Sequence, residues 1–182
     1  MALLRAVQDA LAETQYTASA FAWGTERAVK YRLRPDSEPR SYLSDDALKA
    51  YDLQLAEKGP RCLEDRIKLI FGHATQALSF QLEVQFADPN HAESHGAPVD
   101  DERIEWKTPW LTLGHIKLPP QAVTHDETIA FHPFHVSDAG LLPLGRLNRA
   151  RLTSYTTSRN TRHEINKVET TPYPYKVPDS LR

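Results

Sequence analysis

The nine residues LSFQLEVQF, at positions 78–86, constrain the fold most, because apolar and polar side chains alternate through them without a break. On an extended strand this alternation places five apolar side chains on one face: Leu78, Phe80, Leu82, Val84 and Phe86. The four polar side chains between them share the other face. An apolar strand face is stable only when further strands or helices cover it. The segment therefore predicts a sheet with one side against a core.

Two further segments are predicted to be strands of this sheet. RAVKYRLRP, at 27–35, alternates apolar with basic residues, so its basic face is expected to look outward, and Pro35 should end it. WLTLGHIKL, at 110–118, begins with Leu111 and Leu113 in phase. It then shifts to Ile116 and Leu118, as a bulge at Gly114 would produce.

Helical spacing separates these strands and follows them. It predicts helices over 2–14, from Ser44 to the Gly-Pro stop at 59–60, over 63–74, and over 144–163. Residues 119–144 show no periodicity and should wrap over other elements, and the tail after residue 169 is rich in proline. The expected fold class is α+β.

Length and charge indicate one globular domain over residues 1–182. The net charge of −2 provides no field that would attract nucleic acid, and no apolar run is long enough to span a membrane. The lone Cys62 cannot form an internal disulfide, which favours a reducing, cytoplasmic location. His91 and His95 are four residues apart, but neighbouring Pro and Gly argue against a helix that would present them to a metal.

The last predicted helix carries an unusual face. Helical spacing aligns six residues that lack an apolar majority: Leu147, Arg151, Ser154, Tyr155, Ser158 and Arg162. An Arg four residues before a Tyr often means no more than an exposed pair that stabilises a helix by about 0.2–0.5 kcal/mol. A tyrosine that ligates ferric iron must be a phenolate, however, and a guanidinium beside it favours that anion. Arg151 is one helical turn from Tyr155, where its guanidinium could do this.

The motif RLTSY, residues 151–155, resembles the proximal-haem helix of catalases, in which an Arg, three residues and the iron-ligating Tyr occur in this order. FHPFHV, residues 131–136, is similar to the aromatic-Pro segment ahead of that helix, and LPLGRLNRAR, residues 142–151, resembles the compact catalase-related haem proteins. The Thr-Thr pair after Tyr155 stands where larger catalases have Pro-Asp, which favours the compact branch. The resemblance runs from about residue 28 to 163. It implies part of an antiparallel β-barrel with inserted helices, a wrapping loop and a C-terminal proximal-haem helix.

The resemblance also implies a role for each residue of the face. Tyr155 would be the axial ligand of haem b, the iron protoporphyrin IX, and Arg151 the partner that favours its phenolate; these two are the expected catalytic residues. Arg162 matches the arginine that binds a haem propionate. The remaining cofactor-binding residues would touch the ring or line its proximal side: Phe131, Leu147, Ser154 and Ser158. His132 and His135, which flank Pro133, would have supporting roles on that side.

The implied reaction is decomposition or peroxidation of hydrogen peroxide or an organic hydroperoxide. In catalases it also needs a distal His and Asn, which lie ahead of the segment matched here, and residues 1–27 contain neither residue type. The chain therefore resembles the later half to two-thirds of a catalase, with impaired chemistry of its own. An incomplete barrel leaves open edges and an exposed apolar face, so a homo-oligomer or a missing N-terminal half is expected. The alternative is a truncated or degenerate catalase-like scaffold that acts as a non-enzymatic interaction module.

Overall fold

The computed structural model describes residues 9–58, 62–87, 99, 104–124, 128–129 and 131–169. His91, His95 and the Pro-rich tail lie outside them. Two compact units are distinguished by their contacts. Unit 1 contains residues 1–16, 32–83 and 112–124, and unit 2 contains 17–31, 84–111 and 125–182. Each unit is described by itself below, and the single domain expected from the sequence stays a prediction.

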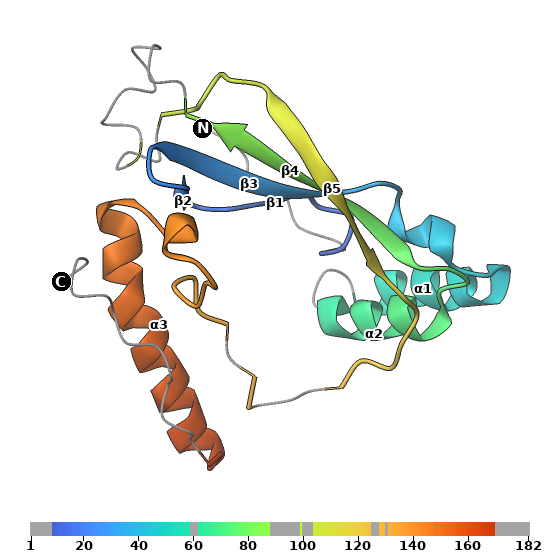
Figure 1. The fold of residues 1–182 in the computed structure, drawn as a ribbon. Coiled ribbons are helices and arrows are strands. Elements are labelled where there is room, and N and C mark those ends of the chain that lie inside the picture. The colour runs from blue at the N-terminus through green and yellow to red at the C-terminus, as the bar shows by residue number, and fades with distance from the viewer. Residues whose placement is uncertain are drawn as a thin grey trace. The chain divides into compact units, whose positions relative to one another are not determined.

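The strands form one antiparallel sheet, in the order β1-β3-β4-β5, with β2 also paired to β3 (Figure 1). Their bounds are Gln15–Tyr16, Phe21–Trp23, Arg27–Pro35, Leu78–Phe86 and Trp110–Leu118. The antiparallel register of β3 and β4 follows from two backbone bonds. Ala87 N–H donates to the Ala28 carbonyl at 2.9 Å, and Asp36 N–H donates to the Ser79 carbonyl at 3.0 Å. The fold class is α+β, as the sequence predicted, and the described sheet is not closed.

Unit 1 contains two helices, α1 (Asp45–Lys58) and α2 (Leu63–His73), which follow the short 3₁₀ helix η1 (Pro39–Tyr42). Ser44 caps α1 as expected, since its hydroxyl accepts from the Ala47 N–H at 3.4 Å. Both helices pack on the apolar face of β4. The buried cluster contains Tyr42, Leu43, Ala47, Tyr51, Ile70, Phe71, Leu78 and Phe80.

One expectation for unit 1 was wrong, and a second held only in part. Of the helix predicted over residues 2–14, the described part from residue 9 is a turn rather than a helix. Asp9 accounts for this locally, because its carboxylate accepts from the Leu11 N–H at 2.9 Å and so stabilises a turn. The basic face of β3 was expected to look outward. The Arg34 side chain does so, at 48% exposed, whereas that of Arg32 is only 21% exposed because it pairs with Glu83.

The strand β5 runs without interruption through Gly114. Leu118 at its end packs against the core of unit 1, but three other apolar side chains of the strand are exposed. Leu111, Leu113 and Ile116 are 50%, 46% and 39% exposed. Among the described strands, β5 has β4 as its one neighbour and so forms an edge of the sheet. This is the exposed apolar edge expected of an incomplete barrel.

Unit 2 places the start of its long helix, α3 (Gly145–Asn166), beside β2. Residues 20–24 and 140–144 pair through backbone bonds: Ala22 N–H donates to Leu142 O at 2.8 Å, Gly24 N–H to Gly140 O at 2.9 Å, and Leu144 N–H to Ala20 O at 2.9 Å. The 3₁₀ helix η3 (Ala139–Leu141) lies within this pairing. The rest of the described wrapping segment is irregular, as predicted.

Candidate functional site

The helix α3, the long last helix in Figure 1, provides Ser154, Tyr155, Ser158, Arg159 and Arg162 to the candidate site. It begins after Leu144 and ends at Lys167, whose left-handed backbone, with φ of 53°, lets its N–H and that of Val168 bond back to Glu164 O and His163 O. Two side chains of the helix, Asn148 and His163, are buried, and Asn148 links the helix to Ser19 and to the carbonyl of Ala20. The remaining faces of α3 are half-buried or exposed, which leaves side chains available to a ligand.

The predicted pair of Arg151 and Tyr155 is formed. The Arg151 Nη2 donates to the Tyr155 hydroxyl oxygen at 2.7 Å, and the guanidinium carbon lies 5.2 Å from the centre of the phenol ring. The short distance allows a strong, charge-assisted bond whenever the phenol oxygen carries negative charge. Tyr155 is 37% exposed, so its oxygen remains accessible.

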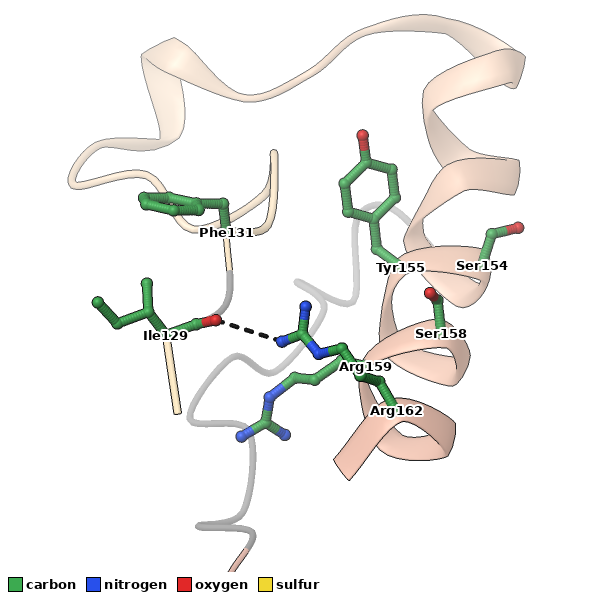
Figure 2. A pocket seen from close by; sticks show the side chains of 7 residues that line it. All are labelled: Ile129, Phe131, Ser154, Tyr155, Ser158, Arg159 and Arg162. Atoms are coloured by element: carbon green, nitrogen blue, oxygen red, sulfur yellow. Dashed lines mark hydrogen bonds between the residues drawn. The ribbon is translucent and has the colours of Figure 1, made fainter. Parts of the chain in front are cut away.

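An open cavity of about 460 Å³ lies beside this pair, a size typical of small-molecule sites. In Figure 2, Ile129 and Phe131 are on one side and the residues of α3 on the other. Two arginines line its far end. The described residues that line it are Ile129, Phe131, Ser154, Tyr155, Ser158, Arg159 and Arg162.

The cavity brings together five of the seven residues proposed from the sequence: Phe131, Ser154, Tyr155, Ser158 and Arg162. Arg151 reaches it through Tyr155. The seventh, Leu147, is 41% exposed on α3 and is not among the lining residues. Its expected contact with a ligand stays a prediction.

The polar residues around the cavity already have local partners. Arg162 Nη2 donates to the Ile129 carbonyl at 3.3 Å, which links α3 to the segment on the opposite side (Figure 2). The Ser154 hydroxyl donates to the Ala150 carbonyl at 3.3 Å. An anionic group entering the cavity would compete with the Ile129 carbonyl for Arg162.

His132 packs against the ring of Tyr155. It is 8% exposed, and its ring lies edge-on to the Tyr155 ring with centres 5.6 Å apart. Its Nδ1 accepts from the Phe134 N–H at 3.2 Å, so Nε2 carries the proton and donates to Leu152 O at 3.3 Å. Burial lowers the pKa of His132, which favours this neutral form. Its position agrees with a supporting role.

Four residues of the site were not predicted from the sequence. Ile129 and Arg159 line the cavity, while Ser19 and Asn148 bond to Arg151. Arg159 is four residues after Tyr155, so helical spacing offered a signal for it. Ser19 offered none, since it lies 132 residues from Arg151 in the chain.

The arrangement can be compared with known structures. A fungal catalase superposes on 87% of this chain with a TM-score of 0.59, at 19% sequence identity. The fold is catalase-like. The chain spans about a third, 32%, of the length of that catalase. No family model and no curated protein matches by sequence.

Two negative findings concern only the residues that the structure describes. Within those ranges, no group of three or more His, Cys, Asp or Glu side chains could hold a bare metal ion. No helix among those same described residues is long and apolar enough to cross a bilayer.

Proposed function

We propose that this chain binds ferric haem b, with Tyr155 as the axial iron ligand. The observation that carries the proposal is the 2.7 Å bond from Arg151 to the Tyr155 oxygen at the edge of an open cavity. A guanidinium so close stabilises a phenolate, the form in which a tyrosine ligates iron. The catalase-like fold is a second, independent support.

The residues present fit this group. Ile129 and Phe131 offer apolar surface across the cavity from the phenol, as a flat macrocycle requires. Phe131 is 87% exposed, so a ligand that covered it would remove apolar area from water. Arg159 and Arg162 at the same cavity suit the carboxylates of haem propionates.

Bound haem would supply redox-active iron for the decomposition or peroxidation of hydroperoxides. The chain itself would hold the ligand oxygen through Arg151 and orient the phenol ring against His132. None of the described residues that line the cavity carries an imidazole or a carboxylate that could act as a general acid on a peroxide. We therefore expect slow turnover from this chain alone.

The test of haem binding is titration of the purified protein with ferric haem, followed by the visible spectrum. Tyr155→Phe removes the ligand oxygen and should weaken binding by tenfold or more, with loss of the tyrosinate spectrum, since a metal–ligand bond is lost. Tyr16→Phe is the matched control, because Tyr16 is a 62% exposed tyrosine on β1. An unchanged spectrum in Tyr155→Phe would refute the assignment.

The proposal includes a partner for the missing side of the site, either an N-terminal half or a second copy of the chain. The exposed side chains of β5 and the one-third coverage of a catalase support it. The same two observations favour the second candidate function, a catalase-like scaffold that acts by interaction and not by catalysis. Protein that self-associates but takes up no haem would favour the scaffold.

A cytoplasmic location is part of the proposal. It is supported by the composition, in which Cys62 is the one cysteine, and by the burial of its thiol.

A further inference from the structure

The second terminal nitrogen of Arg151 points away from Tyr155 and toward two fully buried polar side chains. Arg151 Nη1 donates to Ser19 Oγ at 3.3 Å and to Asn148 Oδ1 at 3.4 Å. Both acceptors are 0% exposed. Buried polar side chains in folded proteins are generally hydrogen-bonded. These bonds therefore favour one position of the Arg151 guanidinium.

Ser19 and Asn148 are themselves fixed. The Ser19 hydroxyl donates to Asn148 Oδ1 at 2.7 Å. The Asn148 Nδ2 donates to the carbonyls of Ala20 at 3.0 Å and Leu144 at 2.8 Å. These two carbonyls determine which side of the amide is nitrogen, so its oxygen must face Ser19 and Arg151.

We propose that Ser19 and Asn148 are positioning residues that hold the Arg151 guanidinium with Nη2 presented to the Tyr155 oxygen. The inference deepens the proposed function and rests on it for its purpose, because the held guanidinium would serve the iron-ligating phenolate. A free arginine side chain samples many rotamers and loses conformational entropy when it is fixed. Here the fold fixes it before any ligand arrives.

The direct test needs no haem. In protein labelled with ¹⁵N-arginine, a held guanidinium rotates slowly and gives separate signals for its Nη protons, whereas a freely rotating one gives averaged signals. Arg151→Lys identifies the signals that belong to Arg151. Ser19→Ala should average the signals of Arg151 in the haem-free protein, and separate signals in Ser19→Ala would overturn the inference.

A second arm measures haem affinity in a double-mutant cycle. Ser19→Ala should raise the Kd for ferric haem roughly five-fold, as expected for losing a bond to a charged group. In the Arg151→Ala background the same change should alter the Kd less than about two-fold, because Ser19 acts through Arg151. Equal effects in both backgrounds would contradict the inference.

The two arms separate this inference from the proposed function. Wild-type protein that binds no haem would refute the proposed function, and the haem-free signals would still decide whether Ser19 holds Arg151. Ser41→Ala is the matched control, since Ser41 is an exposed serine that donates to a backbone carbonyl in unit 1. If Ser19→Ala fails to fold, Ser19→Cys keeps the side-chain size with a much weaker acceptor and should average the same signals.

Discussion

Glu83 lies on the polar face of β4, yet its side chain is only 6% exposed. Its carboxylate accepts from Arg32 Nε at 2.6 Å and Nη2 at 3.1 Å, and from Arg34 Nε at 3.4 Å. The hydrogen bond with Arg32 lowers the pKa of Glu83 below its ordinary value, against the opposing effect of burial. A polar side chain at a strand position can therefore be interior when its charge is matched.

This carboxylate should make stability depend on pH in the acid range. Because its folded pKa lies below the unfolded value of about 4.3, the stabilisation is complete above that pH and is lost as the pH falls through the folded pKa. Glu83→Gln should lower the free energy of unfolding by about 2 kcal/mol at pH 7. It should also reduce the difference in this free energy between pH 7 and pH 3. Urea unfolding at both values measures this. Asp46→Asn, at an exposed carboxylate, should leave the difference intact.

His132 should respond to pH in a higher window. Its folded pKa is lowered by burial, so the fold loses stability as the pH falls from about 6.5 toward the folded pKa. Protonation of Nδ1 would also break the bond from the Phe134 N–H. We expect the Phe134 amide NMR signal to shift with the same midpoint as the His132 ring, below 6.5. Independent midpoints would argue against this coupling.

At the scale of elements, η3 and β2 approach closely enough to require glycine. A Cβ on Gly140 would lie 3.1 Å from the Gly24 Cα and 3.0 Å from the Asp138 carboxylate. The Gly24 backbone, with φ of 67°, and its bond to Gly140 O fix this approach. The contact holds the segment from which α3 begins.

Gly140→Ala should therefore destabilise the protein by about 1–3 kcal/mol, because backbone atoms must move to admit the methyl group. Gly72→Ala provides the opposite control. Nothing lies within 4 Å of a Cβ there, and within helix α2 alanine should stabilise by up to about 1 kcal/mol. Thermal unfolding of both variants measures whether each change lowers or raises the stability. Similar effects of the two changes would contradict the close approach at Gly140.

Periodicity predicted three strands and three helices well, because each carries its own repeat of apolar residues. It did not predict β2, whose three residues are too few for a repeat and which is held by pairing with β3 and with residues near Pro143. It also placed a helix where Asp9 stabilises a turn. A local sequence pattern does not predict structure that depends on backbone bonds between distant parts of the chain.

The candidate site was predicted to the extent that one helix carries it. Arg151 and Tyr155 meet because they are four residues apart on α3, which spacing alone anticipates. Ile129 lies across the cavity, and Ser19 reaches Arg151 from the far end of the sequence. Contacts of this kind depend on the tertiary fold and produce no periodic pattern in the sequence.

For the whole molecule, the free edge of the described sheet matters most. Among the described strands β5 pairs with β4 alone, and it exposes apolar side chains such as Leu113 and Ile116. We expect self-association through this edge. Leu113→Lys should lower the dimer fraction in sedimentation velocity several-fold, because a charge at an edge disfavours strand pairing. Lys117→Leu on the same strand should raise it, and no change in either variant would exclude this edge.

The pairing of residues 20–24 with 140–144 also sets an order of events during synthesis. A chain that emerges from the ribosome N-terminus first leaves the backbone of β2 half-paired until some 120 residues more have been made. Closing so long a loop is slow, and the Ser19 hydroxyl meets Arg151 only afterwards. Under the proposed function, haem binding at Tyr155 would thus be a late step that follows the completion of α3.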